Sequence, residues 1–327
     1  MPLTIDHLSI SLLDNIESDI DEVQFPDNPF DLRIVRRDLL SDLRAKSLMD
    51  KIGLESEVIV INGRNIKTWN HVLEYHFNGE IELPFNENYD RKKPEKIFDD
   101  IVTSLRLLKS WFVDRSYAFN TIKNDPSLGN HAWSSTKPSI MNSEEKDLKR
   151  FNRYELHADD INNLKRVFLA LIKCDDERLR IAISRFNKLY EIQQEVDELI
   201  DIMIGFEALY LDGNDELRFR LATRASKHLG KNPSDCENIY KHLLSAYELR
   251  SSIVHGSKNI LRDDKLLKKC GWNSPAAMID DLSSYLRKAI LLILVDMGIQ
   301  KFKNFHTELD LAIVRGNAFK PNSGECQ

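Results

Sequence analysis

The chain has few cysteines, and none of them are closely paired. Cys174, Cys236, Cys270 and Cys326 are widely spaced among 327 residues, and no C-x-x-C motif occurs. Structural zinc sites and disulfide frameworks are normally recognised by cysteines at short, regular spacing. We therefore expect no metal and no cofactor, and a reducing cytoplasm fits this cysteine usage best.

Long apolar runs are also missing. The longest strongly apolar run, residues 289–295, is far shorter than the roughly 20 residues that a membrane span needs. The first residues, MPLTIDHLSISLLDNIESD, lack the basic and apolar regions of a secretory signal. Both observations favour a cytoplasmic location and no membrane partner.

The chain as a whole has no excess of basic charge. Its formal net charge is −6 at pH 7, which argues against a surface broadly covered by nucleic acid. The charge is unevenly distributed, because residues 215–320 carry 18 Lys and Arg against 12 Asp and Glu, a net +6. This basic segment fits a local RNA contact, although an ordinary solvated face gives the same bias.

The first 90 residues differ in pattern from the rest. Short strand-like runs alternate there with helical patterns, the runs at residues 4–12, 57–62 and 80–85 and the patterns at 39–51 and near 69–75. The polar segment NENYDRKKP at 86–94 then ends in a proline that suits the first turn of a helix. The sequence predicts an N-terminal α/β or β-rich module of unknown role at residues 1–93.

From residue 94 onward the pattern is mainly helical. One interruption, NDPSLGNHAWSSTKPSIMNS at 124–143, is rich in Ser, Asn, Pro and Gly and predicts an exposed loop. Residues 176–211 have a helical apolar stripe that predicts one long helix or two nearly continuous ones. We predict a mainly α fold, with a helical bundle at residues 94–320 and a short tail at 321–327.

Two further segments have clear helix signals. The apolar residues of 216–229 repeat at helical spacing, and Gly230 ends the pattern. Ser274 followed by Pro275 is a good N-cap and first-turn pair for the last major helix. Both segments fit the predicted bundle.

The most informative stretch is DCENIYKHLLSAYELRSSIVHGSKN, residues 235–259. Its apolar residues recur at helical spacing and predict an amphipathic helix, with the stripe at Ile239, Leu243, Ala246, Ile253 and Val254. Gly256 follows the stripe and suits a left-handed cap, so His255 is expected in the final turn. An arginine, Arg250, lies five positions earlier.

Arg250 and His255 together suggest a chemistry. Their Cα vectors should diverge by about 140°, yet a long guanidinium can swing back along the helix axis. An imidazole that exchanges a proton near neutral pH, beside a cation that binds a phosphodiester, suits RNA cleavage without a metal. Two other pairs have similar spacing, Arg64 with His71 and Arg150 with His157, but neither closes an apolar helix with a glycine.

The segment RSSIVHG, preceded by YKHLLSAYEL, resembles the signature helix of the HEPN superfamily (higher eukaryotes and prokaryotes nucleotide-binding), and most closely its ApeA-like branch. Supporting segments occur in the family's order at residues 101–119, 185–211, 216–230 and 280–294. HEPN proteins of this kind are mostly metal-independent endoribonucleases of prokaryotic defence and toxin systems. They act as dimers in which two such motifs form one cleft.

The resemblance implies roles for particular residues. Arg250 would bind the scissile phosphate of RNA and His255 would be the acid/base, in a composite site at a homodimer interface. Many active members have Asn, Asp or His directly after the arginine, whereas this chain has Ser251, which cannot carry charge. The competing expectation is therefore a catalytically inactive HEPN scaffold that binds RNA or a protein partner, and a neutralising or sensing protein is compatible with either.

Four residues are expected to support the pair: Ser251, Glu207, Arg224 and Tyr247. Glu207 lies within the otherwise apolar IMIGFEALYL, where an unpaired carboxylate would be costly to bury. We predict that Glu207 pairs with Arg224 in a structural ion pair.

Overall fold

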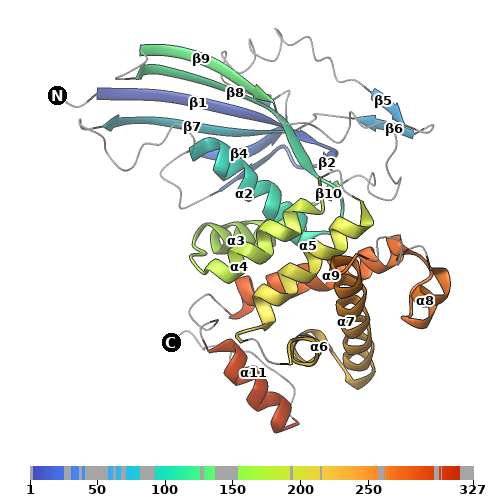
Figure 1. Cartoon of the computed structure of the whole chain (residues 1–327). Helices are drawn as coiled ribbons and strands as arrows, with labels where there is room; N and C mark the ends of the chain where they lie inside the picture. The colour runs from blue at the N-terminus through green and yellow to red at the C-terminus, as the bar shows by residue number, and fades with distance from the viewer. Residues whose placement is uncertain are drawn as a thin grey trace. The chain divides into compact units, whose positions relative to one another are not determined.

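The structure is a computed structural model. It describes residues 3–25, 31–36, 39–40, 58–61, 64–67, 71–81, 93–125, 129–136, 154–191, 194–213, 216–256, 261, 263–297, 302 and 304–316. The chain divides into two compact units, Met1–Phe168 and Leu169–Gln327. Most of the described secondary structure is helical, and the strands all lie in the first unit (Figure 1). The predicted class, mainly α with a β-rich N-terminal module, is confirmed at this level.

Among the described residues, six strands form one antiparallel sheet in the order β3-β4-β7-β1-β8-β9. Their bounds are β1 Leu3–Asp14, β3 Glu22–Gln24, β4 Asp31–Arg36, β7 His71–Ile81, β8 Asp114–Asp125 and β9 Gly129–Thr136. Two small pairs accompany it, parallel β2 (Ile16–Ser18) with β10 (Tyr154–Leu156) and antiparallel β5 (Val58–Ile61) with β6 (Arg64–Lys67). Strand β1 confirms the run predicted at residues 4–12.

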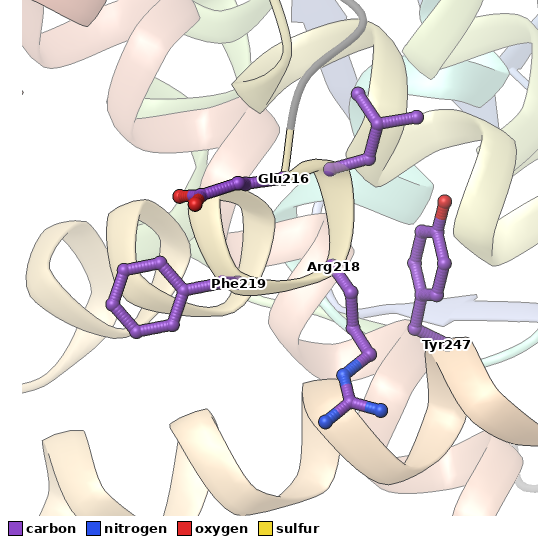
Figure 2. Close-up of a pocket in the computed structure, with 5 residues that line it drawn as sticks. Glu216, Arg218, Phe219 and Tyr247 are labelled. Carbon is purple, nitrogen blue, oxygen red and sulfur yellow. The ribbon is translucent and has the colours of Figure 1, made fainter.

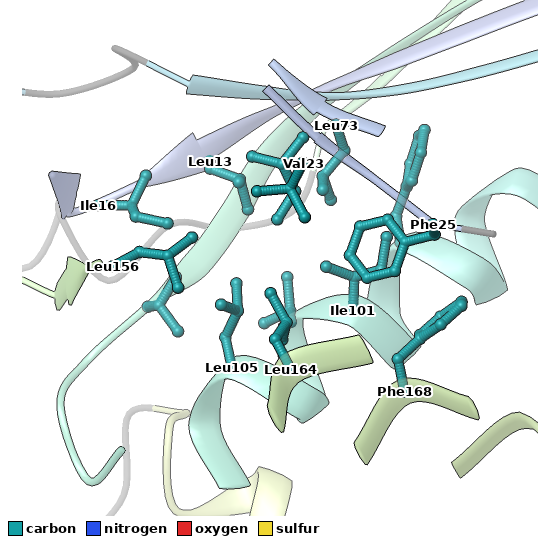
Figure 3. Close-up of a cluster of buried hydrophobic side chains, with 14 of the residues drawn as sticks. Leu13, Ile16, Val23, Phe25, Leu73, Ile101, Leu105, Leu156, Leu164 and Phe168 are labelled. Atoms are coloured by element: carbon teal, nitrogen blue, oxygen red, sulfur yellow. The ribbon is translucent and has the colours of Figure 1, made fainter. Parts of the chain in front are cut away.

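The core of this unit lies between the sheet and helix α2 (Lys93–Leu108). Side chains of α2 at helical spacing, among them Ile101 and Leu105, are fully buried. They pack with Leu13 and Leu73 from the strands and with Phe25, which directly follows β3 (Figure 3). Burying each such side chain contributes about 1.5–3 kcal/mol, so this cluster is a major source of the unit's stability.

Three sequence predictions in this unit need correction. The loop predicted at 124–143 contains strand β9, which pairs with β8 at the edge of the sheet. The helical pattern near 69–75 is strand β7 from residue 71 onward. The units divide at 168/169 rather than at 93/94, because β8 and β9 follow α2 and complete the N-terminal sheet. Of the helical pattern predicted at 39–51, residues 41–51 lie outside the described residues, as do residues 126–128 and 137–143 of the predicted loop.

The second unit consists of helices. Their bounds are α4 Glu177–Lys188, α5 Glu195–Tyr210, α6 Leu217–Leu229, α7 Pro233–Val254, α8 Asp264–Lys269, α9 Pro275–Leu291, the π-helix Leu292–Met297 and α11 Phe305–Val314. Helix α3 (Ile161–Ile172) contains the division between the units. No helix within the described ranges combines the length and apolar character of a bilayer span.

Helix α5 is the central element of the second unit. It contacts α4, α6, α7 and α9 (Figure 1), and its largely apolar sequence suits burial on several sides. Residues 176–211 thus form two helices, α4 and α5, which settles the alternative left open by the sequence. The predicted cap at Ser274 is also confirmed, because its hydroxyl accepts a hydrogen bond from the Ala277 amide at 3.1 Å.

Candidate functional site

The candidate site lies at the C-terminal end of α7. The helix begins with Asn232, whose side chain accepts from the Asp235 amide at 2.9 Å, and Pro233 occupies its first turn. It ends at Val254, with His255 as the C-cap residue. Gly256 has a φ of +103°, the left-handed conformation that the sequence predicted for it and that other residues rarely adopt.

Arg250 reaches from α7 towards α5. Its Nη2 lies 3.5 Å from Oε2 of Glu207, and the two side chains are 25% and 24% exposed. The Nε atom of Arg250 is buried and has no hydrogen-bond partner among the described residues. A buried donor left without a partner costs about 1–3 kcal/mol. Among the described residues the guanidinium is thus held by one long ion pair, and its partial exposure leaves it within reach of a ligand.

The predicted partner of Glu207 was wrong. Arg224, on α6, instead donates to both carboxylate oxygens of Asp310 at 2.7 and 2.6 Å. It also donates to Asp212 at 2.9 Å and to the Tyr210 carbonyl at 2.8 Å. Arg224 thus links α6 to α11 and to the end of α5, and within the described ranges the ion-pair partner of Glu207 is Arg250 instead.

The environment of Glu207 shifts its pKa. Burial raises the pKa of this carboxyl group, and the nearby Arg250 only partly opposes the rise. A carboxylate in this setting is a weak anchor for the guanidinium. A phosphate, which carries full charge and presents several acceptor oxygens, would bind the same guanidinium more strongly.

His255 faces solvent at the helix end. The residue is exposed, as is its neighbour Val254 at 57%. No hydrogen bond or ion pair joins His255 to Arg250 in the part of the chain that the structure describes, which agrees with the angular divergence expected from their spacing. Ser251 is partly exposed, and its carbonyl accepts from the His255 amide at 3.1 Å.

Tyr247, one turn before Arg250, lines an open hollow of about 660 Å³. The other lining residues, Glu216, Leu217, Arg218 and Phe219, all belong to the start of α6 or its cap. Figure 2 shows Arg218 extending between Phe219 and Tyr247. Phe219 is 54% exposed although it lies within a helix.

Phe219 and Arg218 were not among the site residues predicted from the sequence. A signal for Phe219 was present, because it lies off the apolar stripe of residues 216–229. Two positions from Leu217, a helical side chain points about 200° away, so a ring there faces outward. The sequence pattern could therefore have indicated that Phe219 is exposed, but not which residues lie beside it in the fold.

Two other histidines of the helical unit, the buried His228 and the partly buried His242, pack against neighbouring side chains. The Nδ1 of His228 lies 2.7 Å from the Tyr210 hydroxyl, and burial together with nearby Lys288 lowers the pKa of His228 to about 3. The ring of His242 packs against Trp272 with centroids 4.6 Å apart, and burial lowers its pKa as well. These two imidazoles are held neutral inside the unit, whereas His255 is exposed.

Within the described ranges, no three His, Cys, Asp or Glu side chains lie close enough together to hold a metal ion. Comparison of the chain with models of protein families, with curated proteins and with solved structures found no match.

Proposed function

We propose that this protein is a metal-independent endoribonuclease whose composite site combines Arg250 and His255 from two copies of the chain. The observation that carries the proposal is the accessibility of both side chains at the C-terminal end of α7. His255 is exposed, and among the described residues Arg250 has a single long ion pair. Both are accessible to a ligand, and the segment that bears them is the basic part of the chain.

The reaction needs a base, an acid and a fixed cation. One imidazole removes the proton of a ribose 2′-hydroxyl, and the oxygen attacks the adjacent phosphorus. The bond from phosphorus to the 5′-oxygen breaks, and that oxygen takes a proton from an imidazolium. The products are a 2′,3′-cyclic phosphate and a 5′-hydroxyl. Arg250 stabilises the charge that develops on the phosphoryl oxygens.

A homodimer explains why a single chain keeps the two groups apart. Two-fold symmetry would bring two copies of the α7 end together, so that His255 of one copy faces the phosphate held by Arg250 of the other. The resemblance to HEPN proteins gives the same arrangement and favours a role in prokaryotic anti-phage defence or in a toxin system.

The test compares wild type with His255→Ala. Loss of a general base lowers a rate by roughly 10² to 10⁴, so the variant should leave labelled RNA almost intact where wild type yields cyclic-phosphate ends. EDTA should change neither result. Expression in a bacterium gives a second readout, since only wild type should slow growth. The wild-type rate from His255→Ala would reject the nuclease.

The second candidate is a catalytically inactive scaffold of the same fold that binds RNA or a protein partner. The observation that favours it is the ion pair between Arg250 and Glu207, which ties the catalytic cation to its own chain. Ser251 in place of a charged or amide residue points the same way. For a scaffold, wild type and His255→Ala would leave RNA equally intact and allow equal growth.

A further inference from the structure

We propose that the hollow between α6 and α7 is a stacking subsite for one unpaired nucleobase of the RNA strand whose phosphate Arg250 binds. This inference rests on the proposed function, because it identifies the substrate as single-stranded RNA. Phe219, Arg218 and Tyr247 would form the platform.

The first argument is the combination of planar groups. Two aromatic rings and a guanidinium line one open hollow, and its volume of about 660 Å³ lies within the range typical of small-ligand sites. Aromatic side chains and arginine planes are the groups on which unstacked bases pack. Phe219 is held by an edge-to-face contact with Tyr240, with centroids 6.4 Å apart, and is still more than half exposed.

The second argument is the charge of the lining. Arg218 forms an ion pair with Glu248 on α7, so its charge is already matched. The carboxylate of Glu216 also lines the hollow, and it takes part in none of the ion pairs within the described ranges, so it adds a negative charge to the lining. A phosphate would be repelled from this hollow, while a neutral ring with N–H donors would be accepted. The occupant is therefore the base, and the phosphate lies elsewhere.

The third argument is continuity with Arg250. Tyr247 and Arg250 are three residues apart on α7, so their side chains are neighbours on the helix surface, about 4.5 Å apart along its axis. A base stacked at Tyr247 places its own phosphodiester close to the Arg250 guanidinium. A base within a duplex has both faces covered by its neighbours, so only an unpaired one can enter.

The experiment measures binding separately from cleavage. A fluorescently labelled single-stranded RNA is titrated with the His255→Ala protein by anisotropy, and then with Phe219→Ala, Phe219→Leu and Phe219→Trp added to that background. Stacking on an aromatic side chain contributes about 1–3 kcal/mol per base, so Phe219→Ala and Phe219→Leu should weaken binding about 5- to 150-fold. Phe219→Trp should restore it.

Three controls sharpen the result. Phe219→Leu keeps an apolar side chain and the helix, so its loss of affinity reports the ring rather than misfolding. Glu216→Gln removes the negative charge at the rim and should bind RNA as tightly as the parent or more tightly. Fully paired RNA of the same sequence should bind more weakly and should not respond to Phe219→Ala.

The outcomes separate the two proposals. If wild type cleaves RNA but all Phe219 variants bind it with the parent's affinity, the subsite is overturned and the nuclease stands; this is also the result expected if the hollow binds a protein partner instead. If the Phe219 variants lose affinity while wild type never cleaves, the subsite stands and the nuclease fails. Equal binding of paired and unpaired RNA would also overturn the subsite.

Discussion

Two arginines of the helical unit occupy opposite kinds of site. Arg224 is 3% exposed and makes four hydrogen bonds, to two carboxylates and one carbonyl. Burial alone would lower its pKa, but hydrogen bonds with Asp310 and Asp212 more than offset that effect and raise it. Arg250 is 25% exposed and has one ion pair at 3.5 Å.

The difference shows how a structural cation is distinguished from one available to a ligand. Around Arg224, bidentate contacts match the planar fork of the guanidinium, so a ligand could bind it only by displacing hydrogen bonds that it already makes. Around Arg250, a single long contact to Glu207 is the one ion pair among the described residues, and burial raises the pKa of that carboxyl group. This contrast predicts that mutation of Arg250 changes activity more than stability, whereas mutation of Arg224 changes stability.

The largest expected effect is on activity at Arg250. Because the guanidinium is proposed to stabilise charge only as it develops, Arg250→Ala should lower single-turnover cleavage of RNA by about 10² to 10³. Its free energy of unfolding should change by less than about 1 kcal/mol, since one long ion pair contributes little. Urea unfolding and a cleavage assay on the same preparation measure both.

Arg185→Ala is the matched control. That arginine also has a single carboxylate partner, Asp201 at 2.8 Å, and is 34% exposed, but it lies on α4 and outside the candidate site. Cleavage by Arg185→Ala should equal that of wild type. If Arg250→Ala and Arg185→Ala cleave RNA equally well, the contrast between the arginines has no functional meaning.

The next effect is on stability at Arg224. Arg224→Leu removes the donor shared by Asp310, Asp212 and the Tyr210 carbonyl, and hydrogen bonds to charged groups contribute about 1.5–3 kcal/mol. Since both carboxylates are partly exposed and regain water, we expect a loss of about 2–3 kcal/mol in the free energy of unfolding. Arg224→Lys should not rescue it, because an ammonium cannot replace the bidentate fork. Wild-type stability in Arg224→Leu would contradict this role.

The sequence predicted the helices of the second unit because their signals are local. Spacing of apolar residues, Ser274 before Pro275 and Gly256 after the last turn each act within a few residues. The partner of Glu207 is not a local property. It depends on how α5 is rotated relative to α6 and α7. Local sequence patterns do not reveal which arginine that rotation brings near Glu207.

The errors in the first unit have physical causes. Strand β7 has buried side chains on both faces, Val72 on one and Leu73 with Tyr75 on the other, so it lacks the polar alternation that marks a strand. Strand β9 is polar because it lies at a sheet edge, where backbone pairing with β8 needs no apolar side chains. Both patterns become readable only once their neighbours in the sheet are known.

The smallest effect is a pH-dependent change at Glu207. Its pKa is raised in the folded protein, so folding favours the protonated form. The associated stability is fully present below the unfolded pKa of about 4.3 and is lost as pH rises through the folded pKa. Glu207→Gln imitates the protonated form. It should match wild type at pH 4 and exceed its unfolding free energy at pH 7 by less than about 1 kcal/mol.

Asp310→Asn should change the free energy of unfolding in the opposite direction to Glu207→Gln, which completes the comparison of the two arginines. The same carboxylate-to-amide change beside Arg224 removes a charge that the guanidinium grips through both oxygens, so this variant should be less stable than wild type at pH 7. Urea unfolding of both variants at pH 4 and pH 7 measures the pair. A Glu207→Gln protein that loses stability at pH 7, as Asp310→Asn should, would mean that Glu207 is a structural anchor and that Arg250 is no more available to a ligand than Arg224.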